Sequence, residues 1–362
     1  MDVGVLLIFQ NWFSDKTDEE VFREDAELGV LAEQYGFDSA WSVEHHFDDY
    51  SMCPDNLQLM TYLAGRTSRI KLGTGAVILP WNDPLRVVEK AAMLDSLSEG
   101  RLILGMGRGA ARREFTGFRE DIADSREMFD EAAIIIMEGL RTGIVQADTK
   151  HYQQPPVEVR PRPENWSPDR MLMVSMSPSS AEVAADLGLK ALRFSQGEWE
   201  YSMPEINAYR TTFEAKHGKK APPFVISDFV VCVETEEEVG RYTDEYFAKQ
   251  FYQVANHYEW GGEHFKNMPS YATYVALGDA MNAAGGPEKA YKGYIGGNLI
   301  GTPEQLWEKH LMRKSMVGDY EIIANFSYGG MTYETAYNQM KRFADKVMPR
   351  LKADAAEPAL TA

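Results

Sequence analysis

Residues 38–47 of this chain read Asp38-Ser39-Ala40-Trp41-Ser42-Val43-Glu44-His45-His46-Phe47. The first part alternates polar or small residues with apolar ones, which is typical of a β-strand. Three ionisable side chains, Glu44, His45 and His46, follow at once. Parallel barrels keep their chemistry at the carboxyl ends of their strands. This order therefore predicts a barrel strand that ends in a functional site.

The same order of a strand and then a helix repeats on both sides of this stretch. Apolar and β-branched runs predict strands at 3–9, 39–43, 70–78, 102–105, 171–175, 191–194, 224–233 and 320–326. Helical patterns separate them, and a last helix over 333–351 closes the chain. Eight such units predict an α/β fold, a (β/α)8 TIM barrel. A doubly wound sheet is the alternative, and it is disfavoured because no glycine-rich dinucleotide fingerprint follows the first strand.

The length of 362 residues suits one barrel with insertions. We expect a single domain over 1–352 and a C-terminal tail over 353–362. Residues 258–297 come after the helix that follows strand seven and are rich in Gly, Asn, Tyr and Met. We interpret them as a long insertion, and such insertions commonly serve as a lid or an interface.

The charge and the cysteine content narrow the partners and the location. Lys and Arg number 37 against 55 Asp and Glu, a net charge of −18, which argues against nucleic acid or an anionic membrane surface as partner. No apolar run is long enough for a transmembrane helix, and residues 1–9 resemble a buried strand more than a signal peptide. With only two cysteines, Cys53 and Cys232, a cytoplasmic protein is expected.

His45 and His46 are the first candidates for chemistry. Neighbouring residues on an extended strand point to opposite faces, so one imidazole can enter the barrel mouth while the other packs elsewhere. A buried, hydrogen-bonded structural histidine is the alternative. A metal site needs further ligands at matching spacing. The other five of the seven histidines are scattered, so no metal site is predicted and a metal-dependent hydrolase is disfavoured.

Two further segments could bind an anion. Residues 105–114 read GMGRGAARRE, in which Arg108 could grip a phosphate between glycines; the alternative is a turn with solvated arginines. Residues 175–182 open a helix with several serines, which suits either a phosphate or an ordinary N-cap. Gly75 lies within a strand, where a glycine often marks a bulge or the close approach of a ligand.

Taken in order, these segments resemble the bacterial luciferase-like, flavin-dependent monooxygenases, especially the luciferase catalytic subunit, over nearly the whole chain. The motifs that carry the resemblance are Tyr35-Gly36-Phe37-Asp38, Glu44-His45-His46-Phe47, Gly73-Thr74-Gly75-Ala76-Val77-Ile78-Leu79-Pro80, Leu94-Asp95, Gly100-Arg101, Arg108-Gly109, Gly301-Thr302-Pro303-Glu304 and Val347-Met348-Pro349. Each motif is weak alone, but their joint order and spacing are specific.

The resemblance implies a TIM barrel that binds reduced FMN delivered by a separate flavin reductase. Reduced FMN and dioxygen would give a flavin C4a-peroxide that oxidises a small apolar organic substrate such as an aldehyde or a ketone. The resemblance also implies a homodimer. The luciferase catalytic subunit has a cysteine where this chain has Gly107, so the resemblance does not extend to light emission or to a long-chain aldehyde substrate, and a bulkier substrate fits.

The resemblance also assigns roles to particular residues. His45 is the active-site acid or base, and Glu114 corresponds to an acidic residue near the flavin. The cofactor-binding residues are those of the phosphate site and of a non-prolyl cis peptide beneath the flavin ring: Arg108, Met176, Ser177, Ser180, Gly75 and Ala76. Two alternatives stay open, a deazaflavin-dependent dehydrogenase of the same fold and a non-catalytic flavin-binding subunit. Retention of His45 and Arg108 argues against the latter.

Overall fold

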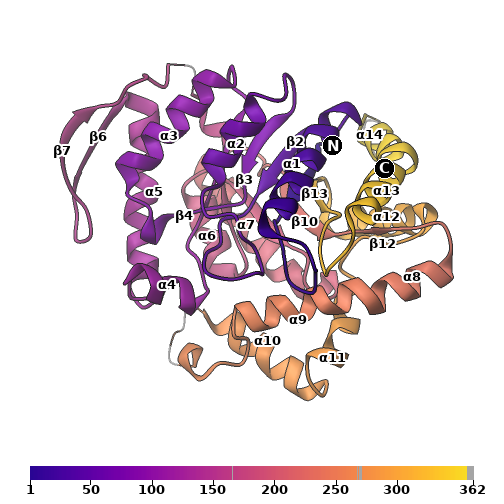
Figure 1. Ribbon diagram of the computed structural model, residues 1–362. Helices are drawn as coiled ribbons and strands as arrows, with labels where there is room; N and C mark the ends of the chain where they lie inside the picture. Colours follow the sequence, from indigo (N-terminus) through magenta and orange to yellow (C-terminus); the bar gives the residue numbers. More distant parts are fainter. Residues whose placement is uncertain (165, 267, 269–270, 357–362) are drawn as a thin grey trace.

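Eight parallel strands close into a barrel in the computed structural model, which describes residues 1–164, 166–266, 268 and 271–356 (Figure 1). In barrel order they are β1 (Val3–Leu7), β2 (Ser39–Ser42), β3 (Lys71–Thr74), β5 (Leu102–Gly107), β8 (Met171–Val174), β9 (Lys190–Phe194), β10 (Phe224–Phe229) and β13 (Tyr320–Asn325). Pairing of β3 with β5 and of β1 with β13 completes the ring. The predicted TIM barrel is confirmed.

Two predicted strands are each divided in the structure. The third is divided into β3 and β4 (Val77–Ile78), and the Gly75–Ala76 peptide between them is cis, as the resemblance implies. The seventh is divided into β10 and β11 (Val231–Cys232), which leaves the barrel and pairs with β12 (Ile300–Gly301). Both runs are mainly apolar and, apart from Lys71 and Phe229, buried, so side-chain periodicity does not reveal where the backbone turns away.

The helices pack around the outside of the barrel (Figure 1). They are α1 (Asp18–Gln34), α2 (Asn56–Ala64), α3 (Pro84–Leu97), α5 (Ser125–Thr142), α6 (Pro178–Asp186), α7 (Met203–His217), α12 (Pro303–Val317), α13 (Tyr333–Lys346) and α14 (Met348–Ala356). The start of α12 is capped, because Thr302 accepts a hydrogen bond from the backbone N–H of Gln305 and Pro303 opens the helix. Within the described part of the chain, none of the helices has the length and apolarity to cross a membrane.

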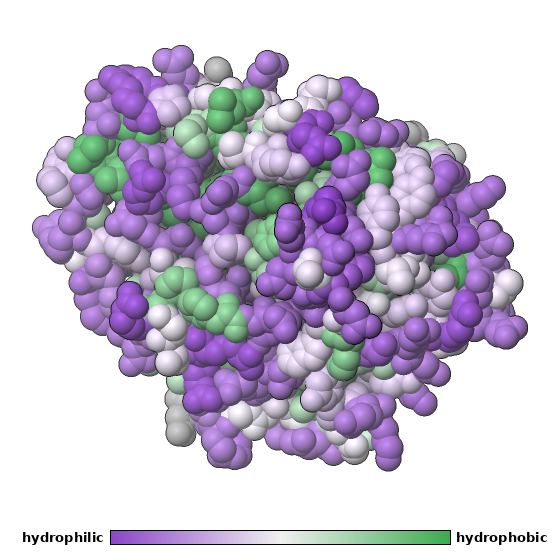
Figure 2. Space-filling view, viewed as in Figure 1, coloured by the Kyte–Doolittle hydropathy of each residue, from purple (hydrophilic) through white to green (hydrophobic). Residues whose placement is uncertain are grey.

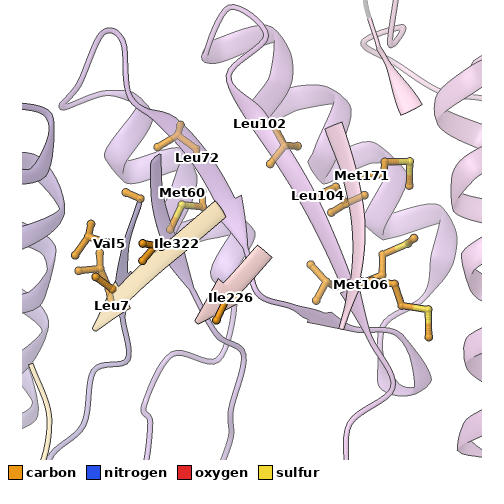
Figure 3. Packing of buried hydrophobic residues seen from close by; sticks show 14 of the residues in the cluster. Val5, Leu7, Met60, Leu72, Leu102, Leu104, Met106, Met171, Ile226 and Ile322 are labelled. Atoms are coloured by element: carbon orange, nitrogen blue, oxygen red, sulfur yellow. The ribbon is translucent and has the colours of Figure 1, made fainter. Parts of the chain in front are cut away.

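Alternation along the strands builds two buried layers. Val5 and Leu7 of β1 face outward into the core between strands and helices, which Figure 3 shows together with Leu72 and Ile226. Leu6, between them in sequence, belongs to a separate cluster inside the barrel. Each fully buried aliphatic side chain contributes about 1.5–3 kcal/mol, so this double layer gives the site a rigid frame.

Two excursions depart from the barrel. Strands β6 (Ile144–Asp148) and β7 (Gln153–Glu158) form an antiparallel hairpin that projects at the left of Figure 1. After strand seven come α8 (Glu236–Tyr242), a π-helical turn (Thr243–Phe247), α9 (Ala248–His257), α10 (Ala272–Ala283) and α11 (Pro287–Ala290). Helices α9 to α11 gather at the bottom of Figure 1, and the face shown in Figure 2 is mostly hydrophilic with separate apolar patches.

Candidate active site

A large cavity lies between the carboxyl ends of the barrel strands and α9. It encloses about 1420 Å³ of empty space, the open solvent at its mouth included. All eight residues predicted from the sequence line it: His45, Gly75, Ala76, Arg108, Glu114, Met176, Ser177 and Ser180. The fold thus brings together segments that are up to 135 positions apart in the chain (45 to 180), while the roles of these residues stay predictions.

His45 and Glu114 form a buried pair at one end of the cavity. His45 follows β2, and Glu114 lies on the short helix α4 (Arg112–Phe118), which the sequence did not predict. Glu114 Oε1 lies 3.0 Å from His45 Nδ1 and accepts the backbone N–H of His46 at 2.8 Å. Burial raises the pKa of Glu114, but the His45 imidazole and the other donors outweigh it and lower the pKa below its ordinary value. Glu114 is therefore a carboxylate.

Tyr258 contacts the other nitrogen of the same imidazole. A carboxylate only accepts hydrogen bonds, so Nδ1 of His45 carries the proton and Nε2 is left as an acceptor. The Tyr258 hydroxyl lies 3.3 Å from Nε2. Burial raises the pKa of Tyr258 well above its ordinary value, which keeps the phenol protonated as a donor. Sequence analysis missed Tyr258, because nothing local marks one tyrosine of a tyrosine-rich segment as special.

His257 lies beside this pair and is fully buried. Its ring stacks on Tyr50 at 4.5 Å between centroids, and it lies 3.5 Å from the Asp48 carboxylate and 3.7 Å from Glu114. Burial, followed by repulsion from His45, lowers the pKa of His257 well below its ordinary value. His257 is therefore neutral near pH 7.

The fold also gathers groups that could ligate a metal. Ligand atoms of His45, Glu114 and His257 lie within 4.8 Å of one another. A second such group, Asp124, Glu127 and His151, does not line the cavity. Sequence spacing could not reveal either set, because each joins separate segments. Metal analysis of the purified protein checks the prediction of no metal.

His46 and Glu44 are structural by their contacts, and the predicted division between the two histidines is confirmed. The His46 ring packs against Phe118 at 4.6 Å and does not line the cavity. Glu44 accepts hydrogen bonds from the Ile78 backbone at 3.1 Å and from the Trp81 indole at 2.7 Å. Glu44 thus fixes the loop after the third barrel strand beneath the cavity.

The opposite end of the cavity is cationic and includes the start of α6. The Arg108 guanidinium lies 4.1 Å from the centre of the Tyr271 ring. Burial lowers the pKa of Arg126, Asp130 opposes that change, and repulsion from Arg108 lowers it further. Two neighbouring guanidinium groups suit a dianion such as the FMN phosphate. Sequence analysis missed Arg126, which lies on α5, away from both predicted phosphate segments.

The first turn of α6 completes this end. The Ser180 hydroxyl accepts the backbone N–H groups of Met176 at 3.1 Å and of Ser177 at 3.0 Å, while Ser177 caps the helix. These hydroxyl and N–H groups face the cavity end that holds the two arginines, and a helix N-terminus favours an anion. The residues therefore fit a phosphate-bearing cofactor.

Comparison with known proteins gives a family and several relatives. The luciferase-like monooxygenase family matches residues 1–319. The alkanal monooxygenase alpha chain of the Kryptophanaron alfredi symbiont is 34% identical over 171 residues, which cover 47% of this chain and 48% of that one. The match thus spans about half the length of that relative.

Solved structures extend the likeness over the whole barrel. The monooxygenase RslO1 from Streptomyces bottropensis has a TM-score of 0.77 and 26% identity, and the match covers 97% of this chain and 100% of that one. Two others share the fold alone: the oxygenating constituent of the 3,6-diketocamphane monooxygenase of Pseudomonas putida, solved with FMN (TM-score 0.72, 16% identity, 97% and 99% covered), and an F420-dependent secondary alcohol dehydrogenase (0.71, 14%, 96% and 98%). The match of the family over residues 1–319, on a barrel with this cavity, means that the chain belongs to the luciferase-like monooxygenases.

Proposed function

We propose that this protein is a monooxygenase that uses reduced FMN and dioxygen to oxidise a small apolar organic substrate, such as an aldehyde or a ketone. The observation that carries the proposal is one cavity with two ends. One end holds the buried Glu114–His45–Tyr258 chain, and the other holds Arg108 and Arg126. Family membership and the fold neighbour solved with FMN support this reading.

The cationic end would hold the cofactor by its phosphate. Arg108 and Arg126 would neutralise the charge, and the hydroxyl and backbone N–H groups of the first turn of α6 would donate hydrogen bonds to the phosphate oxygens. Gly75 and Ala76 would lie against the flavin ring, since both line the cavity between its two ends. Bound reduced FMN would supply the electrons that activate dioxygen.

The end of the cavity that holds His45 and Glu114 would accept and return a proton during the reaction. Glu114 keeps the proton of His45 on Nδ1, so Nε2 can accept a proton and later return it, with the Tyr258 hydroxyl as its partner. Positioned acid–base groups contribute about 10²–10⁴-fold to a rate. Helix α9 and the segment over 258–297, our proposed lid, would keep water from the reacting atoms.

Three further features belong to the proposal. A separate reductase would supply the reduced flavin, as the resemblance implies. A homodimer would cover the exposed apolar side chains of Met93 and Leu97 on α3 and Ile134 on α5. A cytoplasmic location agrees with Cys53 and Cys232, which are both free and buried.

The test is rapid mixing of the protein–reduced-FMN complex with oxygenated buffer, followed by absorbance. We expect a long-lived species whose spectrum differs from that of oxidised FMN. Immediate appearance of oxidised FMN alone would contradict the proposal and favour a deazaflavin-dependent dehydrogenase, for which hydride transfer to F420 is the assay, or a non-catalytic flavin-binding subunit.

The variant His45→Ala separates binding from catalysis. It should bind FMN as the parent does but lose about 10²–10⁴-fold in product formation, because the proton carrier is gone. Turnover equal to that of the parent would remove His45 from the mechanism.

A further inference from the structure

One wall of the cavity lies opposite the barrel strands and is mainly aromatic. Its residues come from the helical segment after strand seven, residues 236–297. Phe247, Phe251, Val254, Trp260 and Tyr294 all line it. The Phe251 ring lies 4.6 Å from Tyr294 and 5.6 Å from Trp260, and the rings of Trp260 and Tyr294 are stacked with 23° between their planes. Such a wall favours flat aromatic ligands, which gain ring–ring contacts that an alkyl chain cannot make.

One polar side chain, Gln250, lies within this wall. It comes between Phe247 and Phe251 on the same face of the helix, it is 1% exposed, and it lines the cavity. Its carbonyl oxygen Oε1 accepts a hydrogen bond from Gln10 Nε2 at 2.7 Å.

The orientation of the Gln250 amide follows from a backbone group. The N–H of Gly329 donates to Gln10 Oε1 at 2.6 Å, and a backbone N–H can only donate. Gln10 must therefore present Nε2 to Gln250, and Gln250 must present its oxygen to Gln10. This leaves the Gln250 amino group, which has no hydrogen-bond partner among the described residues.

A second hydrogen-bond donor in the same wall also lacks a partner among the described residues. It is the indole Nε1 of Trp260, which is buried. Native structures rarely leave such donors unpaired. Both groups donate and neither accepts, so a ligand that satisfies them must carry a hydrogen-bond acceptor, such as a carbonyl oxygen.

We propose that this wall is the substrate site, and that it selects an aromatic ketone or a similar aromatic carbonyl compound over a straight-chain one. The Gln250 amino group donates a hydrogen bond to the carbonyl oxygen, and Phe251, Trp260 and Tyr294 contact the rings. The proposal rests on the proposed function for the reaction that follows, but the binding itself needs no flavin.

The test uses three ligands of ten carbons each and the full chain without flavin. They are 1-tetralone, an aromatic ketone; tetralin, which lacks the oxygen; and 2-decanone, a straight-chain ketone. Isothermal titration calorimetry should give a dissociation constant for 1-tetralone that is about 5–10-fold lower than for either of the others, the range of one hydrogen bond or of one set of ring contacts. Equal constants for 1-tetralone and tetralin, or for 1-tetralone and 2-decanone, would overturn the proposal.

Two variants locate the effect. Gln250→Met should bring the affinity for 1-tetralone down to that for tetralin and leave tetralin unchanged. Gln253→Met is the matched control, because Gln253 is also a buried glutamine of α9 without a partner in the described structure but does not line the cavity. A loss of affinity for both ligands in Gln250→Met, or the same loss in Gln253→Met, would contradict the role of Gln250.

None of these binding measurements depends on the oxygen reaction. The comparison of three ligands on the wild-type chain tests the proposal even if Gln250→Met does not fold. If 1-tetralone is preferred but no flavin species forms with oxygen, the proposed function fails and the binding site stands. If the flavin species forms without this preference, the reverse holds.

Discussion

Two buried carboxylates near the mouth of the barrel, Asp228 and Glu114, are held by partners of different kinds. Asp228 of β10 and Arg313 of α12 make two hydrogen bonds of 2.7 Å. Ser195 donates to the same carboxylate at 2.7 Å, and Arg313 donates to the Gly297 carbonyl at 2.8 Å. This pair ties the end of the helical excursion to the barrel.

The pair of Glu114 and His45 is built differently. Its partner is an imidazole, which can donate a hydrogen bond through one nitrogen and accept one through the other, whereas a guanidinium only donates. Among the described residues, Nε2 of His45 has a single hydrogen-bonding contact, with the Tyr258 hydroxyl at 3.3 Å, and both side chains line the cavity. The doubly hydrogen-bonded pair of Asp228 and Arg313 is suited to hold the fold, and the pair with an imidazole is suited to move protons.

The largest expected effect breaks the first pair. Asp228→Ala would leave the guanidinium of Arg313 buried without its carboxylate, which should lower the free energy of unfolding by about 3–5 kcal/mol. Glu114→Gln keeps an acceptor for His45 and should cost about 1 kcal/mol. Urea unfolding measures both.

The double variant Asp228→Ala, Arg313→Met is the control, since it removes the stranded charge and should recover much of the stability. Similar losses in Asp228→Ala and Glu114→Gln would mean that the two pairs do not differ in their structural role.

The next effect is smaller and concerns FMN binding. It compares these two pairs with two like charges, those of Arg108 and Arg126. If a phosphate relieves their repulsion, Arg108→Ala and Arg126→Ala should each weaken FMN binding by about 10–100-fold, the range of a charge-assisted hydrogen bond. Riboflavin, which lacks the phosphate, should bind nearly as before. Fluorescence titration with both flavins measures the effect.

The exposed Arg160, which pairs with Glu158 on the β6–β7 hairpin, provides the control. Arg160→Ala should leave the affinity for both flavins unchanged. Parallel losses of FMN and riboflavin affinity in the cavity variants would remove these arginines from the phosphate site.

How much could be predicted from the sequence depends on how far apart along the chain the interacting residues lie. The barrel strands came from local alternation, and His45, Glu114 and Arg108 came from motifs that resemble a family. Tyr258 lies 213 positions from the imidazole that it contacts, and the orientation of Gln250 depends on Gly329 through Gln10. No local pattern carries such contacts. The ends of the third and seventh strands could not be predicted for another reason: the chain stays apolar and buried for several residues beyond each end, so no polar residue marks the boundary.

The smallest expected effect is on the pH dependence of stability, and it comes from His257, which lies beside the pair of Glu114 and His45. The pKa of His257 is lowered well below 6.5 on folding, because the ring is buried and lies beside His45. Below pH 6.5 the unfolded chain therefore binds a proton at His257 that the folded chain does not. As the pH drops below 6.5, this group should therefore lower the free energy of unfolding by up to about 1.4 kcal/mol per pH unit.

The lowered pKa of Glu114 acts in the same direction, but only as the pH falls below its ordinary value of 4.5. His257→Phe keeps a ring that can stack on Tyr50 and cannot titrate. Unfolding by urea between pH 8 and pH 5.5 should therefore show a shallower decline for this variant than for the parent. His264 and His310, whose pKa values are also lowered, titrate in both proteins and cancel in the difference. Parallel curves would show that His257 is already accommodated as a cation, in which case the carboxylates of Asp48 and Glu114 pair with it as Asp228 pairs with Arg313.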